Sequence, residues 1–231
     1  MDTNLTQKLF EKAEALDIEG MKTLLSQGAD IESLNDIEEN LLSVVVRLEN
    51  AEQCIIFLLD NGFDINSQDH YASNTALIEA ASYSRVDNVA VLLKEQADPN
   101  LVNLDWQTAL IQAVATRCFE NVQLLLDHGA DVNRMVQGDN ALMTAVSFYK
   151  GDRTILDFLL ARGANINAED GYGTALWSAI AGEKLDLIKF LISKGAKIEG
   201  IKSIHNETTL EFANRVGNQE VIDYLKSQIN R

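Results

Sequence analysis

The stretch LLLDHGADVN, from Leu124 to Asn133, gives the clearest indication of the fold. Leu125 and Leu126 close an apolar run, and Gly129 follows at the point where a helix ends most easily in the left-handed backbone conformation, because glycine has no Cβ. Asp131 and Asn133 then favour a polar turn. The stretch therefore predicts the end of a helix followed by an extended arm.

The same phrase occurs six times along the chain. The other copies are LLSQGADIE at Leu24, LLDNGFDIN at Leu58, LLKEQADPN at Leu92, LLARGANIN at Leu159 and LISKGAKIE at Leu191. The helix-ending position falls at residues 28, 62, 96, 129, 163 and 195, so the steps are 34, 34, 33, 34 and 32 residues. A fixed period of this length indicates an array of stacked repeats.

A second phrase lies between the copies of the first. It begins with Thr or Asn and reads NLLSVV at Asn40, TALIEA at Thr75, TALIQA at Thr108, NALMTA at Asn140, TALWSA at Thr174 and TTLEFA at Thr208. Thr or Asn ahead of an apolar segment is a typical helix N-cap. About 21 residues separate such an N-cap from the next helix-ending position, which leaves room for two short helices and a turn. Each repeat is therefore predicted as a hairpin-like loop, a helix, a turn and a helix, in an all-α repeat solenoid.

The two phrases together resemble the ankyrin repeat, which has a Thr-Pro-Leu-His helix start, an inner Ala pair, a Leu-Leu pair and Gly-Ala-Asp-Val/Ile-Asn. The segments GADVN at 129–133 and GANIN at 163–167 match closely. The helix starts depart from the pattern, because Ala76, Ala109, Ala141 and Ala175 stand in the proline position. The histidine position holds Ile78, Ile111, Met143, Trp177 and Glu211. Because Trp177 stands in the histidine position of the pattern, we interpret it as a structural residue.

The resemblance covers nearly the whole chain and implies a single ankyrin-like domain over residues 1–231. We expect an N-terminal cap at about 3–30, units that begin near 40, 75, 108, 140 and 174, and a C-terminal cap at about 208–231. The unit that begins at Asn140 is two residues longer than its neighbours. The surplus falls near 148–152, at the turn between its two helices.

The charge of the chain is strongly acidic and uneven. The formal net charge is −16, and residues 1–115 hold 6 Lys and Arg against 20 Asp and Glu, whereas residues 116–231 hold 13 against 15. Such a field repels nucleic acid and anionic membranes and attracts a basic protein, although it could also serve only solubility. No apolar run approaches the ~20 residues of a membrane span, and the N-terminus lacks the pattern of a secretory signal. We expect a monomer in the cytoplasm that binds neither nucleic acid nor membrane.

No pattern in the sequence indicates catalysis, a cofactor or a metal site. His70, His128 and His205 lie in different repeats, and so do Cys54 and Cys118, of which Cys54 is expected in the core. The glycine pair at 171–173 has neither the preceding strand nor the Gly-Lys-Ser/Thr of a phosphate-binding loop. We therefore expect a protein that is not an enzyme and needs no cofactor.

The resemblance implies protein binding through the concave side, which loop tips and first helices form. Aromatic residues map to this side where the stack does not need them, among acidic residues, as in a binding hot spot. The candidate partner-binding residues are Tyr71, Glu79, Tyr83, Asp105, Trp106, Asp139, Phe148, Tyr149, Asp170 and Tyr172. Alternatively, individual rings pack on neighbouring loops as local core.

Two hypotheses for function follow from these residues. In the first, the protein is an inhibitor or immunity-type protein whose acidic half mimics a polyanion and blocks a basic partner. In the second, it is a secreted effector or a scaffold that docks through its aromatic side chains. An enzyme is the distant third.

Overall fold

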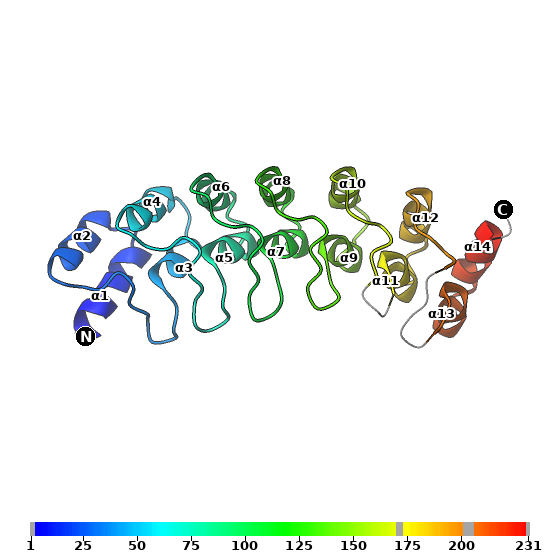
Figure 1. The fold of residues 1–231 in the computed structure, drawn as a ribbon, viewed down its shortest axis with the longest axis horizontal. Coiled ribbons are helices and arrows are strands. Elements are labelled where there is room, and N and C mark those ends of the chain that lie inside the picture. Colours follow the sequence, from blue (N-terminus) through cyan, green and yellow to red (C-terminus); the bar gives the residue numbers. More distant parts are fainter. Residues whose placement is uncertain (1–2, 170–172, 201–205, 230–231) are drawn as a thin grey trace. The chain divides into compact units, whose positions relative to one another are not determined.

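The computed structural model describes residues 3–169, 173–200 and 206–229, and these residues form helices and loops without a named strand. They divide into two compact units, residues 1–131 and 132–231. Figure 1 shows short helices in pairs, joined by long loops. In the first unit the helices are α1 (Thr3–Glu14), α2 (Ile18–Ser26), α3 (Leu41–Val45), α4 (Glu52–Asp60), α5 (Ala76–Ser82), α6 (Val86–Lys94), α7 (Ala109–Ala115) and α8 (Phe119–Asp127). In the second unit they are α9 (Ala141–Ser147), α10 (Thr154–Ala161), α11 (Ala175–Ala181), α12 (Leu185–Ser193), α13 (Thr209–Val216) and α14 (Gln219–Ile229).

Each unit is a stack of helix pairs. In the first unit the inner helices α1, α3, α5 and α7 contact one another in sequence, and the outer helices α4, α6 and α8 form a second row (Figure 1). In the second unit α11 contacts both α9 and α13. The predicted all-α repeat architecture of paired helices is confirmed.

The Thr and Asn residues of the second phrase cap the inner helices. The side chains of Asn40, Thr75, Thr108 and Asn140 each accept a hydrogen bond from the backbone N–H three residues on. Thr208 forms a complete capping box with Glu211, which explains the glutamate in the histidine position. Thr174 departs from the prediction, because its buried hydroxyl makes no such bond within the described residues.

The helix-ending position of the first phrase adopts the left-handed backbone at every copy. Gly28, Gly62, Gly129, Gly163 and Gly195 have φ between 87° and 99°, and Gln96 has φ 68°. At Gln96 the amide of Ala97 donates to Leu92 O at 2.9 Å and the amide of Gln96 donates to Leu93 O at 3.1 Å. This is the Schellman pattern of helix ends, so the repeat keeps its stop even where glycine is missing.

The core follows the two apolar phrases. Leu125 is fully buried, and Ile78, Ile111, Met143 and Trp177 in the histidine position are at most 5% exposed. The Trp177 ring stacks on Phe212 with centroids 4.6 Å apart, and its Nε1–H donates to Thr209 Oγ1. The structural interpretation of Trp177 is confirmed, and so is the burial of Cys54.

Asparagines at the end of the first phrase join successive repeats. Asn100 Oδ1 accepts from the Asp131 amide at 2.8 Å, and Asn100 Nδ2 donates to Gly129 O at 3.0 Å. In the second unit Asn133 makes the same two bonds to Asn165 and Gly163. These side chains hold the start of one loop against the end of the next outer helix.

The extra residues of the fifth repeat lie where the sequence predicts them. Helix α9 ends at Ser147 and α10 begins at Thr154, whereas α5 and α6 are separated only by residues 83–85. Gly151, with φ 98°, makes the turn.

Candidate protein-binding surface

Three hairpin tips of the first unit carry the candidate surface. Each tip is closed by its own backbone bonds: Asn35 N–H donates to Glu39 O, Asp69 N–H to Asn74 O, and Asn103 N–H to Gln107 O. The Asn35 and Asn103 side chains also accept from the amides of Glu39 and Gln107. The side chains at positions 35, 69 and 103 thus hold the tips in a defined conformation, although the tips are too short to form regular strands.

Backbone bonds also join one tip to the next. The His70 amide donates to Glu38 O at 3.2 Å, and the Leu104 amide donates to Ala72 O at 2.9 Å. Gln68 Nε2 reaches Val102 O at 2.8 Å. The three tips therefore form one continuous ledge and hold their side chains in a fixed order.

Large apolar side chains project from this ledge. Ile37 is 61% exposed, Tyr71 77%, Leu104 63% and Trp106 50%. We call these four residues the tip row. Trp106 has φ 59°, a conformation that costs a bulky residue energy, so neither burial nor backbone preference explains the tryptophan there.

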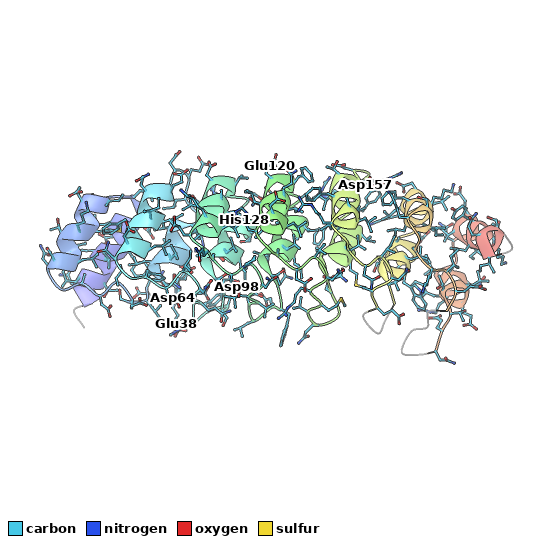
Figure 2. The ribbon with its side chains drawn as sticks, turned by 45° about the horizontal axis from the view of Figure 1, so that its top comes forward. Glu38, Asp64, Asp98, Glu120, His128 and Asp157 are labelled. Atoms are coloured by element: carbon cyan, nitrogen blue, oxygen red, sulfur yellow. The ribbon has the colours of Figure 1, made fainter. Side chains whose placement is uncertain are left out.

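Acidic side chains surround the tip row. Asp36, Glu38 and Asp105 are exposed and have no ion pair among the residues that the structure describes. In Figure 2 Glu38, Asp64 and Asp98 lie on the loop side of the first unit, whereas Glu120 lies on the outer helix α8. The apolar row therefore sits in a negative field.

A partly buried ionic network lies beneath the ledge and supports it. Arg47 donates to Glu39 Oε1 through Nη2 and to Glu79 Oε1 through Nε, both at 2.6 Å. Asn74 Nδ2 donates to Glu79 Oε2 at 2.8 Å, which ties the second tip to the network. Burial raises the pKa of Glu79, against the opposing effect of Arg47.

Two of the candidate residues, Glu79 and Tyr83, contact Arg47 of this network. The Glu79 side chain is only 8% exposed and already paired, so it braces the tips from within. Tyr83 is 51% exposed, and the Arg47 guanidinium lies over its ring at 5.6 Å. The candidate residues do not include Arg47, although it occupies the same repeat position as Ser82; it lies two residues after the end of the preceding inner helix, α3.

The candidates of the second unit lie in different surroundings. Phe148 is 49% exposed in the long turn after α9. Tyr149 is half-buried, donates its hydroxyl to Asp186, and has the Lys184 ammonium 5.9 Å from its ring centroid. Asp139 accepts from Thr144 Oγ1 and from the Asn140 amide. Asp170 and Tyr172 lie outside the described residues.

The described residues contain no cluster of three or more His, Cys, Asp or Glu side chains that could hold a metal ion. Within the same residues, no helix has the length and apolarity needed to cross a membrane.

The sequence of the chain is similar to those of known ankyrin-repeat proteins. A family model described as ankyrin repeats (3 copies) matches residues 9–103 and 96–170. A stretch of 89 residues is 33% identical to the ankyrin repeat and KH domain-containing protein mask-1 of Caenorhabditis elegans. A stretch of the same length is 34% identical to the protein fem-1 homolog A-like of Mus musculus. Each match covers 38% of this chain but only 3% and 13% of those proteins, so the chain corresponds to a small part of them.

Solved structures match over most of the chain. The ankyrin repeat domain of Bcl-3, described as a unique member of the IkappaB protein family, has a TM-score of 0.82 at 27% identity and covers 95% of this chain and 97% of its own. An ankyrin repeat domain from Acinetobacter baumannii AYE has a TM-score of 0.71 at 29% identity and covers 82% of this chain and 98% of its own. The human ASB11 ankyrin repeat domain, at 22% identity, shares the fold with a TM-score of 0.76 over 95% of this chain and 96% of its own.

Proposed function

Because the chain belongs to the ankyrin-repeat family, whose domains generally mediate protein–protein interaction, we propose that it binds a protein with a basic surface through the tip row and Tyr83. The observation that carries the proposal is the joined ledge of tips, which presents four large apolar side chains among unpaired carboxylates. Preordered apolar anchors bind at low entropic cost, and the charges around them select the partner.

The finer role of the complex is also part of the proposal. An inhibitor is favoured if the acidic field dominates binding, because the field would compete with the polyanion that the partner normally meets. A scaffold or secreted effector is favoured if the apolar anchors dominate. We place the inhibitor first, as a monomer that acts in the cytoplasm without catalysis, because the unpaired carboxylates outnumber the basic groups around the tip row.

The experiment is to capture partners with the wild-type chain and with the double variant Tyr83→Ala/Trp106→Ala, and then to measure affinity for the purified partner. We expect the double variant to lose at least about 2 kcal/mol of binding free energy, the scale of a hot spot. Phe158→Ala is the matched control, because Arg162 lies over the Phe158 ring at 4.6 Å but the ring belongs to outer helix α10.

Circular dichroism melts of all three proteins separate binding from folding. Equal affinity of the double variant and the wild type, with both folded, would refute the tip row as the binding surface.

A further inference from the structure

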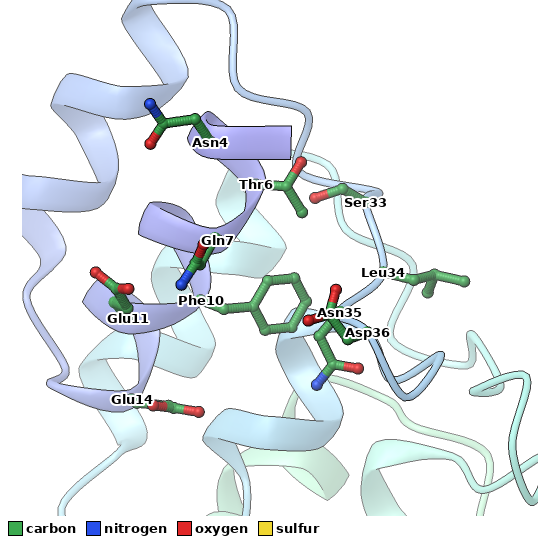
Figure 3. Close-up of a pocket in the computed structure, with 10 residues that line it drawn as sticks. All are labelled: Asn4, Thr6, Gln7, Phe10, Glu11, Glu14, Ser33, Leu34, Asn35 and Asp36. Carbon is green, nitrogen blue, oxygen red and sulfur yellow. The ribbon is translucent and has the colours of Figure 1, made fainter. Parts of the chain in front are cut away.

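A groove lies at the start of the first unit, next to the first hairpin tip, where Asp36 precedes Ile37 of the tip row. It has a volume of 620 Å³ and lies between helix α1 and the loop that leads into the first hairpin tip (Figure 3). The lining residues that matter for recognition are Asn4, Gln7, Phe10, Glu11, Glu14 and Asp36. We call it the N-terminal groove and propose that it holds an extended, Lys- or Arg-rich segment of the partner. This inference rests on the proposed function, since it identifies the part of the partner that is recognised.

The first argument is the open edge of the hairpin ledge. Asp36 follows Asn35 in the first tip as His70 follows Asp69 and Leu104 follows Asn103 in the next two. The amides of His70 and Leu104 each donate to the preceding tip. The Asp36 amide has no such acceptor among the described residues, and Asp36 lines the groove. An extended segment in the groove would supply the missing carbonyl, as in recognition by strand addition.

The second argument is charge. Glu11, Glu14 and Asp36 line the groove, and no described Lys or Arg forms an ion pair with any of them. Of the two lysines of α1, Lys12 is paired with Asp17 at 2.8 Å, and Lys8, one turn before Glu11, is exposed, so the groove lining holds three carboxylates beside one lysine of α1 without an ion pair in the described residues. A segment with Lys or Arg side chains would neutralise the three carboxylates, whereas an acidic segment or a nucleic acid would be repelled.

The third argument is shape. Asn4, Gln7, Glu11 and Glu14 recur at helical spacing and so form one stripe along α1, beside Phe10, whose ring points toward the loop and supplies an apolar floor (Figure 3). The stripe from Asn4 to Glu14 is about 15 Å long at 1.5 Å per residue. An extended segment of about five residues, at about 3.3 Å each, fits this length. Its side chains would alternate between the floor and the carboxylates.

The test uses the whole chain and a fluorescein-labelled, end-blocked peptide of seven residues in which Arg and Val alternate. Binding is measured by fluorescence polarisation, with a peptide that carries Glu in place of Arg as the negative probe. The groove variant is Glu11→Gln/Glu14→Gln. The matched control is Asp60→Asn/Glu95→Gln, which removes the same charge from exposed positions at the ends of outer helices α4 and α6.

We expect the groove variant to bind the Arg-Val peptide about tenfold more weakly than the wild type and the control variant to bind within about twofold of it. In a ¹⁵N-labelled chain, the Asp36 amide should shift on titration with the peptide and exchange with solvent more slowly. Equal weakening in both variants would overturn the inference, because the peptide would then respond to the field of the whole chain. An unmoved Asp36 amide, or no binding of the Arg-Val peptide at all, would overturn it as well.

The peptide experiment is independent of the tip row, because it needs no natural partner and leaves Tyr83 and Trp106 unchanged. Failure of the groove inference therefore leaves the test of Tyr83→Ala/Trp106→Ala intact. Conversely, loss of the tip-row proposal would not alter the binding of the peptide to the groove.

Discussion

At the scale of single residues, Gln96 stands where the other repeats have glycine. Its φ of 68° lies in the left-handed region, and the two bonds of the Schellman pattern hold it there. A residue with a Cβ pays about 1–2 kcal/mol for this conformation. Packing between repeats offsets this cost, because the repeats can stack only if the loop after Gln96 leaves its helix in the same direction as the other loops.

We therefore predict that Gln96→Gly stabilises the protein by up to about 1 kcal/mol, because the gain in backbone conformation exceeds the added entropy of the unfolded chain. Urea unfolding of the purified protein measures the change. The control is Glu95→Gly at the adjacent position, where φ is −82° and glycine should destabilise by about 0.5–1 kcal/mol. Destabilisation by both substitutions would contradict this explanation of the helix stop.

Asn88 and Asn121 occupy the same position of successive outer helices, yet they bond differently. Asn88 Nδ2 donates to Val46 O at 2.9 Å and to Leu48 O at 2.8 Å, which fastens α6 to the preceding turn. Asn121 is fully buried, and neither polar atom of its side chain has a partner within the described residues. A buried polar group without a partner costs about 1–3 kcal/mol.

The same substitution at both positions should therefore have opposite effects. We predict that Asn88→Leu destabilises by about 1–3 kcal/mol, because it leaves two carbonyls unpaired, and that Asn121→Leu is neutral or stabilising. Leucine already occupies this position in α10 and α12, as Leu156 and Leu187. Thermal melts of the two variants test this prediction. Equal losses of stability would indicate that the Asn121 side chain is hydrogen-bonded.

At the scale of the elements, no helix pair buries its apolar face by itself. The inner helices are only five to eight residues long after the first pair, too short to be stable alone, so they depend on neighbours above and below. The hairpin tips depend on neighbours in the same way, through the bonds from His70 and Leu104 to the preceding tip. Both the core and the binding ledge therefore exist only in the stack.

Helix α8 offers the direct test of this dependence. Leu125 is fully buried, and we predict that Leu125→Ala lowers the free energy of unfolding by about 2–5 kcal/mol through lost burial and a cavity. Gln123→Ala in the same helix is the control and should change stability by less than about 0.5 kcal/mol. A loss near zero for Leu125→Ala would mean that α8 does not need its neighbours.

At the scale of the whole molecule, charge is the dominant property. The formal net charge of −16 is concentrated in residues 1–115, the part of the chain that also bears the tip row and the N-terminal groove. The negative field around the tip row speeds the association with a positively charged partner. At 0.1 M salt, screening limits the reach of this field to about 10 Å. Fast association is therefore expected of the complex.

We predict that raising NaCl from 50 to 300 mM lowers the association rate with the partner by about tenfold and changes the dissociation rate much less. Stopped-flow fluorescence at several salt concentrations measures both rates. A constant association rate would refute the acidic inhibitor and favour the scaffold that docks through Tyr71 and Trp106.

The repeat, its helix caps and its helix stops could all be predicted from the sequence, because they depend on residues close together in the chain. The period, the N-cap side chain of Thr108 and the left-handed backbone at Gly129 are local properties and could be predicted. The exposure of Tyr71 and Trp106 followed from the same period, since residues at the tip of a loop lie outside the core.

Which charged groups meet can be seen only in the folded chain. Arg47 lies 32 residues from Glu79, and one carboxylate that the sequence suggested for the surface is paired beneath it. The missing acceptor of the Asp36 amide is likewise recognised only by comparing the folded tips. The equivalent amides of the next two tips each donate to the preceding tip, and among the residues that the structure describes the Asp36 amide does not. Interactions between repeats depend on side-chain reach across the stack, and the spacing of residues along the chain does not encode that reach.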